Sequence, residues 1–269
     1  MTTQIARGAR VRVEQVRVEH VMGTAIVIDV RDQAIDTEMR DRAIEAAFAH
    51  LRDVDQRFST YKPDSEVSRL NAGEVRADRC SPELTSVLEM CDQARIISDG
   101  YFDIRGHRSD GMLDPSGMVK GWSVDGAARI LDDHGLANYS INAAGDVLTR
   151  GEPEPGMPWR IGLRNPWDAQ TTVAVVEGRD MAIATSATYE RGEHVIVPRT
   201  GRPPSGVASM TVVGHSLTWA DTWATAAFAM GVRGVDWVAR ELDGYEACAV
   251  SVDRHLVTSA GFERWMGER

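Results

Sequence analysis

One lysine stands between two aspartates in the stretch "DPSGMVKGWSVDG", residues 114–126. Lys120 lies between Asp114 and Asp125, with Gly117 and Gly121 on either side of it. A helix face in water needs no such glycines, whereas a lysine that reaches a phosphate or the ring edge of a bound cofactor could need them, because glycine lets backbone and ligand approach closely. The stretch is therefore our first candidate for a ligand site.

A carboxylate and a hydroxyl group share one face of a predicted helix further along the chain. Asp221 and Thr225 in "ADTWAT" are four residues apart, and residues at that spacing are neighbours on a helix. Their oxygen atoms are hard ligands that suit magnesium or calcium. The alternative is that Asp221 lies in the first helical turn, where the helix dipole favours a negative charge. Spacing alone favours this alternative.

Three more residues have side chains that suit a site, but each has a structural alternative. Asp103 in "GYFDIRG" could contact a ligand or cap a turn, and Tyr61 in "FSTYKPD" could stack on a planar ligand or pack in the core. The local sequence favours the structural alternative for both. His194 begins a short apolar run before the turn at Thr200-Gly201 and is a candidate proton acceptor, although a lone histidine is often structural.

Composition excludes several classes of protein. The formal net charge of -10 argues against nucleic acid as a partner, since such binding needs clustered Lys and Arg. Cys80, Cys91 and Cys248 form no CxxC pair, which predicts buried thiols in a reducing compartment. The chain has no run of 18 apolar residues and begins without an apolar signal region or a lipobox cysteine. We therefore expect no membrane insertion and a cytoplasmic location.

Several familiar catalytic motifs are missing from the sequence. It contains no GxxxxGK[ST], no GxGxxG after a strand, no GxSxG and no HExxH. These absences argue against a P-loop nucleotide hydrolase, a Rossmann dehydrogenase, a serine hydrolase and a zinc protease.

Hydrophobic periodicity predicts the elements that would position these residues. Helices are expected over 37–58, from Pro82 after a capping Ser81, around 124–131 with an end near Gly135, and over 220–231 and 236–242. Strands are expected over 11–18 and 22–30, at the runs "NYSIN", "WRIGLRN", "TTVAVVEG", "DMAIAT" and "ASMTVVG", and in a hairpin over 245–260. Helices and strands do not alternate strictly. We therefore predict an α+β fold of mixed, largely antiparallel sheets with packed helices, in one domain over 1–269.

Seven motifs in order make the chain resemble the FAD:protein FMN transferases, historically labelled thiamine biosynthesis lipoproteins. The motifs are "MGT", "FSTYKPDSEVSRLN", "GYFD", "DPSGMVKGWSVDGAARIL", "NAAGDV", "IATSATYERGEHVIVPRTG" and "TVVGHSLTWADTWATAAFAMG". They cover nearly the whole chain. No single motif identifies the family, but seven motifs in the same order as in the family are specific for it.

The resemblance implies an activity and a set of site residues. Members of this family use magnesium to split the diphosphate of FAD, attach FMN to a Thr or Ser hydroxyl of an acceptor flavoprotein, and release AMP. By resemblance the metal ligands are the Gly117 carbonyl, Asp221 and Thr225. We expect His194 to take the proton of the hydroxyl, with Asp221 and a metal-bound water as alternatives. We expect Asp125 to be a first-turn or structural residue of the helix that follows it. The residues implied to contact FAD are Met22, Tyr61, Tyr101, Phe102, Asp103, Asp114, Lys120 and Ile196.

Three positions depart from the family pattern. Val197 stands where an aspartate is usual, and Ala144 and Ala187 stand where glycine is usual. The alanines are tolerable if their φ angles stay negative. The loss of a charge at Val197 leaves two alternatives to the transferase open: a hydrolase that splits FAD into FMN and AMP, and a protein that binds FAD without catalysis.

Overall fold

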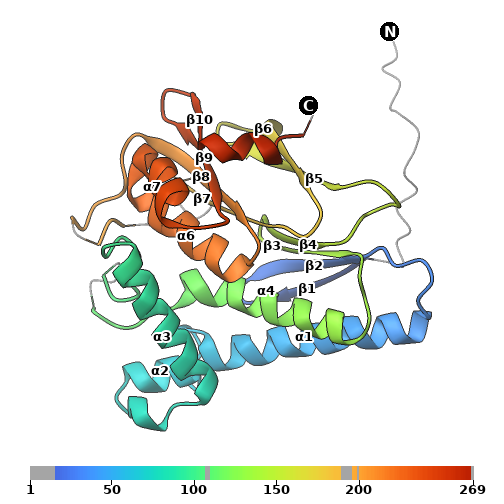
Figure 1. Ribbon diagram of the computed structural model, residues 1–269. Coiled ribbons are helices and arrows are strands. Elements are labelled where there is room, and N and C mark those ends of the chain that lie inside the picture. The colour runs from blue at the N-terminus through green and yellow to red at the C-terminus, as the bar shows by residue number, and fades with distance from the viewer. Residues whose placement is uncertain (1–15, 107–109, 189–195, 199, 268–269) are drawn as a thin grey trace.

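The computed structural model describes residues 16–106, 110–188, 196–198 and 200–267. Eight strands in this part form one sheet, and a further two form a second sheet (Figure 1). Every pairing between these strands is antiparallel. The predicted α+β fold with largely antiparallel sheets is confirmed. The large sheet has the order β1 (Val16–Val21), β2 (Thr24–Val30), β3 (Tyr139–Ala143), β4 (Asp146–Arg150), β7 (Ala182–Ala187), β8 (Val207–Gly214), β9 (Glu246–Ser251) and β10 (Leu256–Thr258).

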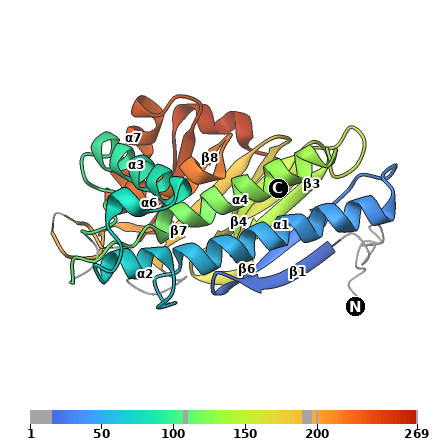
Figure 2. The same ribbon diagram turned by 90° about the horizontal axis from the view of Figure 1, so that it is seen from below.

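Helices lie against one face of the large sheet. Figures 1 and 2 show the two longest of them, α1 and α4, side by side under the strands β1 to β4, while α6 lies against β7 and β8. Among the described helices, none is both long and apolar enough to cross a membrane. The helices are α1 (Thr37–Phe58), α2 (Glu66–Asn71), α3 (Pro82–Ile97), α4 (Ser116–Asp133), α6 (Leu217–Ala229) and α7 (Gly234–Glu241).

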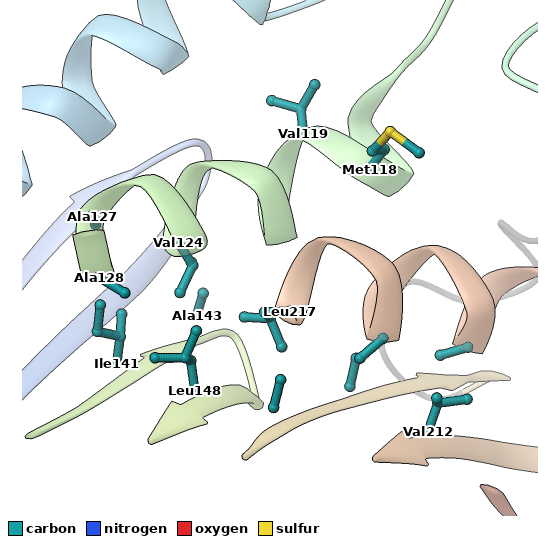
Figure 3. Close-up of a cluster of buried hydrophobic side chains, with 14 of the residues drawn as sticks. Met118, Val119, Val124, Ala127, Ala128, Ile141, Ala143, Leu148, Val212 and Leu217 are labelled. Atoms are coloured by element: carbon teal, nitrogen blue, oxygen red, sulfur yellow. The ribbon is translucent and has the colours of Figure 1, made fainter. Parts of the chain in front are cut away.

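The main core fills the space between these helices and the sheet. Val124 and Ala128 on α4 point toward Ile141 and Leu148 on the strands, and Leu217 at the start of α6 closes the same cluster (Figure 3). All five side chains are at most 1% exposed. Burying apolar surface is the main favourable term in folding, so this cluster holds α4 and α6 to one sheet.

The other face of β7, β8 and β9 carries a second core. Side chains alternate across a strand, so Ile183, Val213 and Cys248 point away from the helices. They pack against the small sheet formed by β5 (Trp159–Asn165) and β6 (Asp168–Gly178) and against the short helix η4 (Ala260–Trp265). The centre of the large sheet is therefore covered on both faces.

Several elements differ from the sequence-based expectation, among them the short helix α2, which was not expected. The helix expected from about residue 124 begins at Ser116, so Lys120 lies inside α4. Pro115 precedes it and the Asp114 carboxylate accepts a hydrogen bond from the Ser116 N–H at 3.1 Å, which starts the helix early. Glycine lowers helix propensity, but tertiary contacts override it here. Strand β4 was not expected at all, because its five residues show no alternating pattern.

Candidate active site between α4 and α6

The helices α4 and α6 are in backbone contact. A Cβ atom on Gly121 would lie 2.3 Å from the carbonyl oxygen of Leu217, so only glycine fits at this position. Next to this contact, the Asp125 carboxylate accepts hydrogen bonds from Ser216 Oγ at 2.7 Å, the Leu217 N–H at 3.0 Å and the Thr218 N–H at 2.9 Å. Ser216 itself makes no capping bond with its side chain. Asp125 therefore has a structural contact, since it caps α6 from the middle of α4, but it does not lie in the first turn of its own helix.

The ammonium group of Lys120 lies between two carboxylates. It forms ion pairs with Asp146 and, at 3.5 Å, with Asp221 Oδ1. The side chains of Asp146 and Asp221 are 2% and 7% exposed, whereas that of Lys120 is 25% exposed. These three side chains carry a formal charge of -1 in a largely dry environment, where electrostatic interactions are stronger than in water.

Asp146 was missing from the predicted site. It follows the tight turn between β3 and β4 and pairs with Ala143 across the hairpin. Its Oδ1 accepts a hydrogen bond from the Thr185 N–H on β7 at 2.9 Å. The motif "NAAGDV" contains this residue, but no spacing in the sequence connects it with Lys120. Only the order of the strands brings β4 to the start of α4.

The three predicted metal ligands lie at the same contact of α4 with α6. A Cβ on Gly117 would be 4.0 Å from Thr225 Oγ1, and that hydroxyl is 3.4 Å from Ser186 Oγ on β7. Asp221 is the fifth residue of α6, and the first turn of that helix holds no acidic residue. The alternative that Asp221 belongs to the first turn is therefore wrong.

These oxygen atoms fit a magnesium ion that is also bound to a phosphate. Mg²⁺ usually takes one or two carboxylates and completes its shell with water and substrate phosphate oxygens. Asp221 supplies a buried carboxylate, and Thr225 a half-buried hydroxyl on the same helix face. In the described ranges no group of three or more His, Cys, Asp or Glu residues could hold a metal. Asp221, Thr225 and the carbonyl of Gly117 are the residues here that could hold such an ion.

Two predicted FAD contacts, Met22 and Phe102, lie next to α4. Met22 has a φ of +55° in the turn between β1 and β2, and its Sδ is 3.6 Å from Ser123 Oγ. The Ser123 hydroxyl donates to the Lys120 carbonyl at 2.7 Å. Phe102 is buried, and a Cβ on Gly117 would be 3.3 Å from its ring. Both side chains therefore lie within one turn of Lys120 or Gly117.

Asp103 lines a cavity of about 510 Å³ between α2, α3 and the segment that leads to α4. The cavity also has Asn71 and Leu113 in its wall, which hydrogen-bond to each other through the Asn71 amide. Asp103 Oδ1 accepts from the Arg105 N–H, so it also caps a turn. Asp114 closes the same segment through its N–H, which donates to the Ile104 carbonyl at 2.8 Å.

Tyr101 and Tyr61 differ in their surroundings. Tyr101 is partly buried and packs against the main core. Tyr61 is 94% exposed on the loop after α1, so the alternative that it is a core aromatic residue is wrong. Of the other predicted residues, Ile196 is half-buried, and His194 lies outside the described residues.

The three departures from the family pattern have different surroundings. The Val197 N–H donates to the Arg202 carbonyl at 2.9 Å, and the Val197 carbonyl accepts from Thr200 and Gly201. Backbone bonds thus close this turn without a side chain at 197. Ala144 has a φ of +56°, so the condition of a negative φ fails there, whereas Ala187 is not among the described residues with positive φ.

A family model and several curated proteins match this chain. The model of the ApbE family matches residues 22–108 and 104–249. The chain is 37% identical over 163 residues to an FAD:protein FMN transferase of Vibrio cholerae, covering 57% of this chain and 47% of that protein. A protein of the same name from Salmonella typhimurium is 31% identical over 164 residues, covering 57% and 45%. The matched part thus spans about half the length of these relatives.

Solved structures show the same fold. An ApbE protein from Thermotoga maritima has a TM-score of 0.79 at 23% identity and covers 94% of this chain and 99% of that one. The flavin transferase ApbE from Vibrio cholerae has a TM-score of 0.80 at 24% identity, covering 93% and 98%. The family model extends over most of the described residues, including α4 and α6. This chain therefore belongs to the ApbE family.

Proposed function

We propose that the protein is an FAD:protein FMN transferase that attaches FMN to a Thr or Ser hydroxyl of an acceptor flavoprotein and releases AMP. The observation that carries the proposal is the ammonium of Lys120 between the buried carboxylates of Asp146 and Asp221, with the Thr225 hydroxyl on the same face of α6 as Asp221. Curated relatives with that name support it. A cation and hard oxygen donors at one point suit a reaction at a diphosphate.

In the proposed reaction, the hydroxyl oxygen of the acceptor attacks the phosphorus of the FMN half of FAD. The bond from this phosphorus to the bridging oxygen breaks, AMP leaves with that oxygen, and the hydroxyl proton passes to a base, for which His194 is our candidate. Lys120 holds charge on the diphosphate, because a fixed cation in a dry site stabilises the negative charge that develops there. Met22, Phe102 and Asp103 would line FAD.

The residues that would hold Mg²⁺ are Asp221, Thr225 and the carbonyl of Gly117. When bound, the metal supplies positive charge that offsets the charge of the phosphates. Asp221 is oriented for this by α6, whose first turn is fixed by Asp125. The metal is thus proposed to bind with the nucleotide.

The test measures products from FAD, Mg²⁺ and purified flavoproteins of the same organism. We expect AMP in solution and flavin fluorescence that stays with an acceptor on a denaturing gel. Free FMN together with AMP would instead support a hydrolase. If neither AMP nor a flavin-labelled acceptor is formed, the result would support a protein that binds FAD without catalysis. Asp221→Asn is expected to slow AMP release at least about 100-fold. Asp236→Asn, an exposed carboxylate on α7, is the control and should have no effect.

A further inference from the structure

Asp146 has no role in the proposed reaction as described so far, yet it is the most deeply buried acid near Lys120. Its side chain is 2% exposed, and both of its oxygens are engaged. Oδ1 accepts from the Thr185 N–H on β7, and Oδ2 pairs with the Lys120 ammonium. A carboxylate held at one oxygen by the backbone of a strand is a fixed anchor for a cation at the other.

The position of Asp146 is set by the sheet. It is the first residue of β4 and pairs with Ala143 directly after a turn of two residues. That turn, Ala144-Gly145, has positive φ at both residues, and the Gly145 N–H is held by Asn142 Oδ1 at 2.9 Å. The carboxylate therefore belongs to the rigid frame, whereas the lysine side chain has four rotatable bonds and needs a partner to define its place.

The composition indicates that the ammonium group itself matters at position 120. Of the 30 Lys and Arg residues, only Lys62 and Lys120 are lysine. An ammonium is a compact point charge, whereas a guanidinium is wide and planar. The space between Asp146 and Asp221 thus suits lysine, in a chain that otherwise uses arginine almost throughout.

We propose that Asp146 is a positioning residue for the transfer reaction, which holds the Lys120 ammonium at the diphosphate and keeps it from closing on Asp221. This inference rests on the proposed function. Lys120 forms the two ion pairs described above, with Asp146 and with Asp221. If Asp146 is removed, the pair with Asp221 remains, and the ammonium would then compete with Mg²⁺ for the Asp221 carboxylate. Loss of Asp146 therefore acts through Lys120 and through Mg²⁺ binding.

The test is a double-mutant cycle on AMP release from FAD, with wild type, Asp146→Asn, Lys120→Met and the double variant. We expect Asp146→Asn to lower kcat/KM for FAD about 100-fold, the size of effect that a misplaced group produces. The double variant should be no slower than Lys120→Met, because residues that act as a unit give non-additive effects. Asp146→Glu should recover at least tenfold of the loss. The matched control is the half-buried pair of Lys62 and Asp55, whose substitutions should leave kcat/KM unchanged.

A second readout does not depend on turnover. Manganese binding in the presence of FAD and without an acceptor protein, followed by electron paramagnetic resonance, should weaken in Asp146→Asn and recover in the double variant, because the lysine no longer competes for Asp221. Urea unfolding of all four proteins checks that each one folds. If Asp146→Asn does not fold, Asp146→Glu replaces it in the double-mutant cycle with Lys120→Met.

The outcomes separate the inference from the proposed function. The role of Asp146 would be overturned, and the function would stand, if the wild type releases AMP but the double variant loses kcat/KM by the product of the losses in Asp146→Asn and Lys120→Met. Unchanged manganese binding in Asp146→Asn would do the same. A wild type that releases no AMP from FAD would overturn the proposed function, and the role of Asp146 in the reaction with it.

Discussion

Ala144 adopts a backbone conformation that favours glycine. Its φ of +56° lies in the left-handed region, which costs an L-residue roughly 1–2 kcal/mol. We expect Ala144→Gly to raise the free energy of unfolding by about 1 kcal/mol, after allowing for the larger entropy of glycine in the unfolded chain. Urea denaturation measures this. Ala187→Gly is the control: that residue is fully buried in β7, so the same change should destabilise the protein.

Val197 lies in a turn that touches the segment after Asp103. A Cβ on Gly106 would be 2.7 Å from Pro198 Cβ and 3.1 Å from Asp103 Oδ2. A carboxylate at 197 would therefore stand in a turn that packs near Asp103, a residue of the proposed FAD site. We expect Val197→Asp to speed AMP release at least about tenfold, or roughly 1.4 kcal/mol of barrier.

The measurement for position 197 is single-turnover AMP release at saturating FAD and Mg²⁺. Val197→Asn separates the hydrogen bond from the charge. Equal rates for wild type and Val197→Asp would mean that residue 197 contributes only its backbone hydrogen bonds to this turn. The departure from the family pattern would then have no effect on catalysis.

At the scale of elements, Gly121 sets the distance between α4 and α6. Alanine there would force a Cβ to 2.3 Å from a backbone carbonyl, and backbone cannot give way as a side chain does. We expect Gly121→Ala to cost about 1–3 kcal/mol of stability, the usual range for overpacking, and to weaken Mn²⁺ binding because the proposed ligands Gly117 on α4 and Asp221 on α6 move apart. Arg129→Ala, exposed on the same helix, should change neither quantity.

The pairing of these helices shows what the sequence could and could not predict. Periodicity predicted α1 to the residue, and the i, i+4 spacing put Asp221 and Thr225 on one face. Gly117 and Gly121 in α4 were misinterpreted as a sign against a helix, because the reason for Gly121 is the backbone of α6, which is distant in the chain, and Gly117 lies against the Phe102 ring. Asp146 was missed for the same kind of reason: its partner lies on another element, and local patterns carry no information about that.

At the scale of the whole molecule, two buried thiols on opposite faces of the sheet should lower the free energy of unfolding at alkaline pH. Burial raises the pKa of Cys91 and of Cys248 from 9.0 to about 12. Burial also raises the pKa values of Tyr139 and Tyr245. In the unfolded chain each thiol ionises near pH 9. Stability is thus fully present below pH 9 and is lost as pH rises toward 12.

Urea unfolding at pH 7.5 and at pH 10.5 measures this loss. We expect each thiol to remove about 2 kcal/mol at the higher pH, since one pKa unit corresponds to about 1.4 kcal/mol. Cys91→Ala should flatten part of the dependence, and Cys248 and the tyrosines should keep the rest. A Cys91→Ala profile parallel to that of wild type would contradict the assignment.

The cap that Asp125 places on α6 also has a consequence for how the protein is made. Asp125 and its partners are 91 to 93 residues apart in the chain. A ribosome therefore finishes α1, α4 and the strands β1 to β4 long before it reaches α6, and contacts this distant in sequence are slow to form. Lys120 and Asp146 are made before Asp221, so no complete site exists until α6 leaves the exit tunnel.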